Sequence, residues 1–255
     1  MISPLAHVDP SAKIGKNVTV YQFAYIDKNV EIGDNCEIMP HASIMSGARL
    51  GKGNRVFNGA VIAAEPQDFK YKGDTTLAVI GDDNVIRENV VINRATTPEG
   101  QTFIGNGNFL HEGVHISHDT HIGNHCVLGY GSKVSGNCFF EDYSIFGGNV
   151  LASQGSRVGT WSMTQTGCRF RKDVPPYIVA ALEPTTYYGV NSFILSHQGV
   201  SDKVIKHISH AYRIIYQSGL NTSDALTKVE AEVPASPEIE YIVDFIRNSE
   251  RGIIR

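Results

Sequence analysis

The stretch VHISHDTHIG, residues 114–123, places three histidines and one aspartate within ten positions of an otherwise apolar and glycine-containing segment. Five of the ten histidines of the chain fall in this neighbourhood: His111, His115, His118, His121 and His125. An imidazole beside a carboxylate is suited to a metal site or to general base catalysis, and a histidine can also be a plain surface residue. The fold that positions these residues determines whether they form a metal site, include a general base or are plain surface residues.

Spacing argues against a metal. Hexapeptide-repeat carbonic anhydrases have three zinc histidines, two of them separated by four intervening residues, and no pair here has that spacing. A serine or cysteine nucleophile is not indicated either, because the chain has no GxSxG motif. Its four cysteines form no CxxC pair, so we expect free, buried thiols. We predict no metal site.

Composition excludes several classes of protein. The 255 residues are 42% hydrophobic, which suffices for a core, and the net charge of −4 gives no overall reason to bind nucleic acid. The first ten residues do not have the pattern of a signal peptide, and no window approaches 18 uninterrupted apolar residues. We therefore expect a cytoplasmic protein without a membrane span and without a nucleic-acid partner.

A period of six organises most of the chain. Of 26 positions six residues apart within three blocks, only Ala152 and Thr164 are not bulky and apolar. Six residues of α-helix turn a side chain by about 600°, so no helix can keep this stripe on one face. Short strands around a prism can, with three hexapeptides closing one coil of 18 residues. The sequence predicts a parallel β-helix. The blocks begin at Ile2, Ile80 and Ile104 and end at Ile62, Ile92 and Phe170.

Two segments leave this rhythm, and the period resumes in phase after each. We predict that two loops project from the prism, residues 64–79 (AEPQDFKYKGDTTLAV) and 97–103 (TPEGQTF). Loops on a rigid scaffold are frequent places for ligand contacts, so Gln67, Asp68 and Lys70 become candidate binding residues. The alternative is an ordinary solvated loop.

The 18-residue coil places Gly136 directly above His118, about 4.8 Å away. A glycine exposes its backbone N–H without a side chain in the way. A base next to a backbone donor suits acyl transfer, whose tetrahedral intermediate carries an oxyanion. Asp119 follows His118 and could orient its ring. From stacking alone, His118 is either an outward-facing catalytic base or a surface histidine.

The repeat stops near residue 176. Pro175 and Pro176 cannot continue a ladder, and they mark the predicted exit from the β-helix. A helical pattern begins near residue 192 and becomes clear after a capping Ser201; two more helices are expected at residues 222–232 and 236–248, each near a Ser or Thr cap. We predict a β-helix over residues 1–176 and a small helical domain over residues 177–255.

Several motifs together resemble the acyl-carrier-protein:UDP-N-acetylglucosamine O-acyltransferases of lipid A biosynthesis. They are the coil that starts at residue 2, QDFKY, HISHD, DVPPY, GVN at 189–191, and the terminal RGIIR, and they span nearly the whole chain. The resemblance implies a mainly β fold, a left-handed parallel β-helix followed by a small helical domain, and a homotrimer. It also implies transfer of an (R)-3-hydroxyacyl chain from acyl carrier protein to the 3-hydroxyl of UDP-N-acetylglucosamine.

The resemblance also assigns roles. It implies that His118 is the general base, Asp119 its partner and the Gly136 N–H the oxyanion donor. No cofactor is expected, because the phosphopantetheine arrives on the carrier protein. The substrate-binding residues implied are Gln67, Asp68, Lys70, His115 in the acyl groove, Asn137, Gln154 and Asn191.

This chain departs from the better-known members at several positions. Asn137 and Ser153 replace histidines, and His197 and Gln198 stand where those members have an arginine pair near the diphosphate. Gln165 and Thr166 occupy the region that gauges acyl length. A further feature is the absence of acidic residues between positions 143 and 172, where four cations could dock the carrier protein: Arg157, Arg169, Arg171 and Lys172.

Three other classes share parts of the pattern. A glucosamine N-acyltransferase normally begins with a separate uridine-binding domain, whereas the coil here starts at residue 2. A CoA-dependent acetyltransferase would share the base but not the loop, the helices or the ending. A solenoid that only scaffolds would need neither HISHD nor two loops that preserve the phase.

Overall fold

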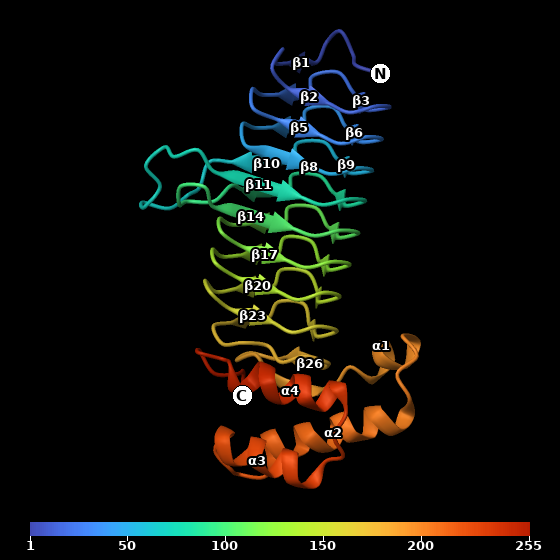
Figure 1. The fold of residues 1–255 in the computed structure, drawn as a ribbon, viewed down its shortest axis with the longest axis vertical. Helices are drawn as coiled ribbons and strands as arrows, with labels where there is room; N and C mark the ends of the chain where they lie inside the picture. The colour runs from blue at the N-terminus through green and yellow to red at the C-terminus, as the bar shows by residue number, and fades with distance from the viewer.

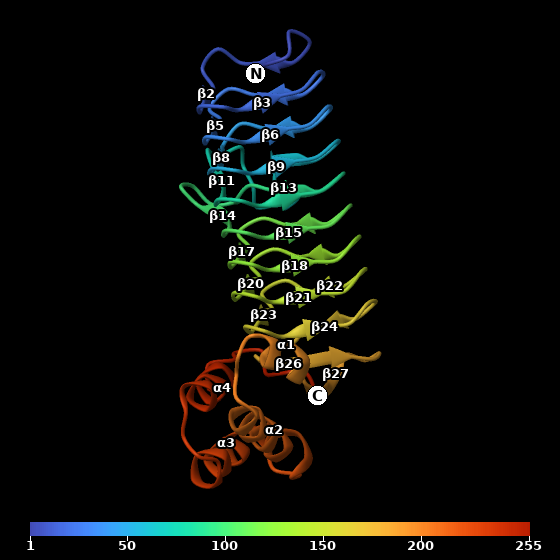
Figure 2. The ribbon, with the colours of Figure 1, turned by 90° about the vertical axis from the view of Figure 1, so that its right-hand side faces the viewer.

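The structure, a computed structural model that describes residues 1–255, is a long three-sided prism of stacked coils with a helical part at one end. The N-terminus lies in the coil at the open end, and the helices cover the opposite end (Figure 1). The view from the side shows the coils stacked in parallel and the helices below the last coil (Figure 2). None of the helices is both long and apolar enough to cross a membrane.

Three sheets form the faces of the prism. Sheet 1 contains β1 His7–Val8, β4 Tyr25–Ile26, β7 Ser43–Ile44, β10 Val61–Ala64, β13 Val91–Asn93, β16 His115–Ile116, β19 Lys133–Val134, β22 Leu151–Ala152 and β25 Arg169–Phe170. Sheet 2 contains β2 Lys13–Ile14, β5 Glu31–Ile32, β8 Ala48–Leu50, β11 Leu77–Ile80, β14 Gln101–Ile104, β17 His121–Ile122, β20 Phe139–Phe140 and β23 Arg157–Val158. Sheet 3 contains β3 Thr19–Val20, β6 Glu37–Ile38, β9 Arg55–Val56, β12 Val85–Ile86, β15 Phe109–Leu110, β18 Val127–Leu128, β21 Ile145–Phe146, β24 Met163–Thr164, β26 Ile178–Ala181 and β27 Thr186–Val190.

The predicted register is confirmed. As far as β25, parallel pairs join residues 18 apart wherever no loop intervenes, as Ile116 to Val134 and Ile122 to Phe140. The inward side chains stack into one core that runs the length of the prism, and most of them are fully buried. Ile2 is 49% exposed, because it lies at the open end where no further coil covers it. The coils form a left-handed β-helix, as expected.

Both predicted loops are present; the first is shorter than expected, and the second has the expected length but begins three residues earlier. Residues 77–79 belong to β11 and residues 101–103 to β14, and these two strands pair with each other along their whole length. Buried positions alternate along both strands, so each strand buries one face: Ala78 and Ile80 in β11, and Thr102 and Ile104 in β14. The segments outside strands are therefore residues 65–76 and 94–100.

The tandem prolines do not end the β-structure, contrary to prediction. Pro175 and Pro176 occupy a corner of the prism, where no ladder N–H is required. After this corner β26 pairs in parallel with β24, and β27 returns antiparallel to β26. Strand pairing thus extends beyond the boundary placed at residue 176, and the first helix begins at Ser192.

The helical part contains α1 Ser192–His197, α2 Asp202–Gln217, α3 Thr222–Glu232 and α4 Pro237–Arg247. Ser201 and Ser236 cap α2 and α4 as predicted, whereas the cap of α3 is Asn221, whose side chain accepts from the Asp224 N–H. Tyr212 of α2 is fully buried and donates to the Pro176 carbonyl, which fixes the helices against the last coil.

Candidate active site

Both loops that interrupt the coils leave the prism at the same edge, which also carries His118. We call the corner that leads from sheet 1 into sheet 2 the first corner. Residues 65–76 and 94–100 both leave the prism there, and in Figure 1 they project to one side near β10 and β11. Two coils after the first of these loops, the same corner holds His118, between β16 and β17. The scaffold thus brings loop and histidine together.

His118 lies between two carboxylates. Its Nδ1 is 2.7 Å from Asp119 Oδ2, and its Nε2 is 3.3 Å from Asp68 Oδ2. The residue lies outside the prism as predicted, but it is only 8% exposed, because Asp68 of the first loop covers it. This enclosure distinguishes it from an ordinary surface histidine, the alternative that the sequence left open.

Asp119 is held in turn by hydrogen bonds with two threonines. Both of its oxygens are 3.2 Å from the Thr96 N–H, and Oδ2 also accepts a 2.6 Å bond from Thr96 Oγ1. Its own N–H donates to Thr102 Oγ1 at 2.9 Å. Thr96 lies within the second loop and Thr102 in β14 directly after it, and sequence reasoning missed both. The only signal was their place beside a segment that breaks the period.

Gly136 stacks on the His118 ring, as predicted. A β-carbon there would lie 2.6 Å from His118 Nε2, which is closer than real β-carbons approach other atoms, so only glycine fits. The Gly136 N–H donates to no backbone carbonyl. At the equivalent turn position of the next corner, the Asn124 N–H donates to Asp142 Oδ1, a residue 18 positions on. The Gly136 N–H therefore remains available to a ligand oxygen.

The side-chain amide of Asn93 fixes the ring of His115. Its Nε2 is 2.7 Å from Asn93 Oδ1, while Asn93 Nδ2 donates to the Glu65 carbonyl at 2.6 Å. Since the amide nitrogen of Asn93 is occupied by Glu65, its oxygen faces His115 as an acceptor. Burial, and to a lesser degree the charge of Lys133, lower the pKa of His115. The lowered pKa favours the neutral ring, which lies on an outward position of sheet 1, three residues from His118.

Arg94 anchors the first loop. Its guanidinium donates to the Ala63 carbonyl at 3.1 Å, to Tyr71 Oη at 2.7 Å and to Glu65 Oε1 at 3.1 Å. These contacts hold the loop over the first corner and keep Asp68 within reach of His118. The Lys70 N–H donates to Asp68 Oδ1 at 2.7 Å, which orients that carboxylate.

The remaining predicted residues fall into two groups. Gln67 and Lys70 are exposed on the first loop, and Asn137 and Gln154 are exposed along the first corner beyond Gly136. All four thus lie on the first loop or along the corner that carries His118. Asn191, in contrast, is buried at the start of α1.

The Asn191 side chain donates to the Trp161 carbonyl at 3.0 Å, and its N–H donates to the Tyr177 carbonyl at 2.7 Å. Within one chain it is not brought to His118. Its visible role is to join α1 to the last coils.

A left-handed prism of hexapeptide coils, with an enclosed histidine at one corner, defines the class of hexapeptide-repeat transferases. Consistently, the family model "Bacterial transferase hexapeptide (six repeats)" matches residues 29–64 and 101–136. The model "Udp N-acetylglucosamine O-acyltransferase; Domain 2" matches residues 173–254. The two models therefore cover coils and helices alike.

Relatives that match over the full length narrow the assignment to one family. The acyl-[acyl-carrier-protein]–UDP-N-acetylglucosamine O-acyltransferase of Pseudomonas entomophila is 38% identical over 255 residues, covering 100% of this chain and 99% of the relative. The crystal structure of LpxA, a UDP-N-acetylglucosamine acyltransferase from Bacteroides fragilis, is 60% identical with a TM-score of 0.99, and the match covers 100% of both chains. The Francisella novicida enzyme is 37% identical with a TM-score of 0.94, covering 100% of this chain and 94% of that one.

The chain belongs to the acyl-[acyl-carrier-protein]–UDP-N-acetylglucosamine O-acyltransferase family, and it is an acyltransferase.

Proposed function

We propose that the chain transfers an (R)-3-hydroxyacyl group from acyl carrier protein to the 3-hydroxyl of UDP-N-acetylglucosamine, with His118 as general base. The observation that carries the proposal is the geometry around His118. Its Nδ1 is held by Asp119 at 2.7 Å, and a glycine with an available N–H is stacked on its ring. Base and oxyanion donor are thus on one edge of the prism, one coil apart.

In the proposed reaction, Asp119 keeps the Nδ1 proton in place, so the neutral ring presents the Nε2 lone pair to the sugar. The 3-hydroxyl oxygen attacks the thioester carbonyl carbon while its proton passes to Nε2. The resulting oxyanion accepts from the Gly136 N–H. When the intermediate collapses, the C–S bond breaks and His118 returns the proton to the leaving thiolate. No acyl-enzyme and no resident cofactor are needed.

The substrates would contact residues on both sides of the base. Asp68, with Lys70 and Gln67 on the same loop, would bind the glucosamine, and Asn137 and Gln154 would contact the rest of the nucleotide. Asn191 would contribute from a neighbouring chain of a trimer, since within one chain it lies away from His118. His115, neutral and beside the base, would line the acyl groove. The phosphopantetheine arm arrives with the carrier protein, and the reaction takes place in the cytoplasm.

One assay tests this function. The purified protein is offered three donors, the (R)-3-hydroxyacyl thioesters of acyl carrier protein and of CoA and acetyl-CoA. Each is tested with UDP-N-acetylglucosamine and with an O-acylated UDP-glucosamine that has a free amine. We expect an O-acylated sugar nucleotide from the carrier thioester at a far higher kcat/KM than from the CoA thioester. Equal or better use of acetyl-CoA would favour a CoA-dependent acetyltransferase. Acceptance only of an already O-acylated glucosamine amine would favour an N-acyltransferase, and either result would refute the proposal.

We further propose that the protein is a homotrimer. Light scattering measures the mass in solution, and about three times the 27.9 kDa of one chain is expected. A stable monomer with full activity would exclude a trimer as the working form.

A further inference from the structure

The arginines of the chain divide into paired and unpaired sets. Of the eleven arginines, six form ion pairs with carboxylates: Arg49, Arg55, Arg87, Arg94, Arg157 and Arg247. Four of the five unpaired ones gather where the coils meet the C-terminal tail, namely Arg169, Arg171, Arg251 and Arg255. A cluster of cations without internal counter-charges is suited to bind an anion from outside.

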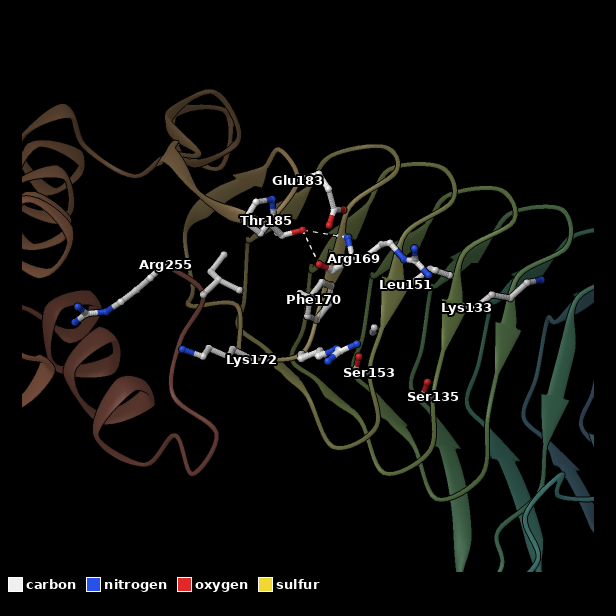
Figure 3. Close-up of a pocket in the computed structure, with 14 residues that line it drawn as sticks. Lys133, Ser135, Leu151, Ser153, Arg169, Phe170, Lys172, Glu183, Thr185 and Arg255 are labelled. Atoms are coloured by element: carbon white, nitrogen blue, oxygen red, sulfur yellow. Dashed lines mark hydrogen bonds between the residues drawn. The ribbon is translucent and has the colours of Figure 1, made fainter.

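Two adjoining cavities open at this place. The larger, of about 660 Å³, is lined by cations that include Lys133, Arg169, Lys172 and Arg255, with Glu183 as its only carboxylate (Figure 3). The smaller, of about 520 Å³, is lined only by Asn137, Ser153, Gln154, Gly155, Arg171 and Arg251. We call the smaller one the anion cavity. Arg171 and Ser153 belong to both.

The tail positions Arg251 in the anion cavity. Asp173 forms a parallel bridge with Ile253, so the last residues run along the final coil. Arg251 Nε then donates to the Arg171 carbonyl at 2.9 Å, which leaves the two terminal nitrogens free for a ligand. A β-carbon at Gly155 would lie 3.1 Å from Arg251 Nη1, so the guanidinium rests against this glycine. The fold thus anchors the Arg251 guanidinium beside the backbone of Arg171, whose own side chain lines the same cavity.

The distance between the anion cavity and His118 indicates which anion the cavity can bind. It begins at Asn137, the residue after Gly136, and Gln154 is one coil of about 4.8 Å further along the first corner. In a sugar nucleotide the diphosphate is attached to C1, two ring carbons from the reacting 3-hydroxyl. It must therefore bind within about one sugar ring of His118. The phosphodiester of a phosphopantetheine arm is separated from its thioester by the whole pantetheine chain.

We propose that Arg171 and Arg251 bind the diphosphate of the sugar nucleotide in the anion cavity, beside Gln154. Guanidinium groups match phosphate oxygens with paired, charge-assisted hydrogen bonds, and two of them at one cavity suit a diphosphate better than a single phosphate. This inference rests on the proposed function, and it adds the residues that hold the diphosphate.

Calorimetric titration of the full-length protein with UDP-N-acetylglucosamine, UDP and uridine tests the site without requiring turnover. We expect Arg171→Gln and Arg251→Gln each to weaken the binding of UDP-N-acetylglucosamine and UDP by roughly tenfold to hundredfold. Uridine, which has no phosphate, should bind as it does to the unchanged protein. Arg213→Gln is the matched control, because Arg213 is unpaired and exposed on α2, outside both cavities. Arg171→Lys, which keeps the charge, should retain part of the affinity.

Two outcomes would overturn the inference. Unchanged UDP binding in folded Arg171→Gln and Arg251→Gln proteins would exclude these arginines as diphosphate ligands. A raised KM for the acyl carrier thioester, with sugar-nucleotide binding intact, would assign the cavity to the acyl donor instead. Failure of the proposed function is a separate result, because it would appear as a lack of acyl transfer by the unchanged protein.

Discussion

The coils before residue 62 and the coils after residue 91 share one core and differ at one corner. Their inward residues form a single ladder, in which Ile26 lies next to Ile44 and Ile92 next to Ile116. At the first corner of the early coils, Asp27 accepts from the N–H groups of Lys28 and Ser46, which only stabilises the turn. The later coils carry the second loop, His118 and Gly136 at that corner, and the first loop leaves the same corner between the two groups of coils.

The difference shows that functional residues can be placed at the corners of a β-helix. A corner residue such as His118 contributes little to the inward ladder, so its type can change without loss of the core. The coil spacing nevertheless places each corner residue at a fixed distance from the next. A catalytic pair can therefore be built from residues 18 apart in the chain.

The strongest test of this contrast removes His118, the proposed general base. His118→Ala should lower kcat by about 10²–10⁴, the usual effect of losing a general base, while the melting temperature changes little. His125→Ala and His121→Ala are controls. His125 is exposed and stacks on Tyr143, and His121 is packed between Phe103 and Phe139, remote from Gly136. Retained kcat in His118→Ala, with loss in a control, would mean that the base is another histidine.

A core substitution should affect both regions equally in stability but not in activity. Ile44→Ala and Ile116→Ala each remove a fully buried side chain, and each should lower the free energy of unfolding by about 2–5 kcal/mol. Chemical denaturation measures this. Below the unfolding transition only Ile116→Ala should reduce kcat, because Ile116 adjoins His115 and the turn of His118. Equal kcat in the two variants would show that the corner does not depend on its local core.

A smaller effect is expected from the threonine beneath Asp119. Thr96→Val removes the 2.6 Å hydroxyl bond to the carboxylate but keeps the shape, so kcat should fall roughly tenfold with KM unchanged. Thr96→Ser should restore most of the activity, because it restores the hydroxyl. Loss in both variants would indicate a packing role instead of the positioning of Asp119.

The smallest expected effect concerns pH. Because burial lowers the pKa of His115, the unfolded chain binds a proton that the folded chain does not as the pH falls below about 6.5. Stability should therefore decrease from pH 6.5 downward until the lowered pKa of the folded protein is reached. His115→Gln should make melting temperatures less dependent on pH between 7 and 5. His121, whose pKa is also lowered by burial, should keep part of the slope. An identical slope in the variant would contradict this account.

Particular residues show how far sequence reasoning reached. The period of six placed Ile116 and Val134 in register, and the same addition placed Gly136 on His118. The break in the period made Asp68 a candidate binding residue, the motif resemblance gave it a role, and the structure brings it to His118. Thr96 was missed, because its contact with Asp119 joins a loop to a corner across 23 residues without any repeat that relates the two.

The prolines at 175 and 176 were misjudged for a related reason. Their effect on a ladder depends on whether they fall on a face or at a corner of the prism. After the last regular hexapeptide, at Phe170, no period remains that could tell the two apart. Only the pairing of β26 with β24 shows that the coil continues.

By itself, the sequence determined the prism, because a strict period of six permits only short strands in 18-residue coils, and with it the vertical neighbours of every residue. Tertiary structure alone decided which groups meet across unequal separations. It placed Asp68 over His118, Thr96 under Asp119, and Arg251 beside Arg171. Such contacts depend on the paths of loops and of the tail, which are set by hydrogen bonds between residues far apart in the chain and leave no periodic trace in it.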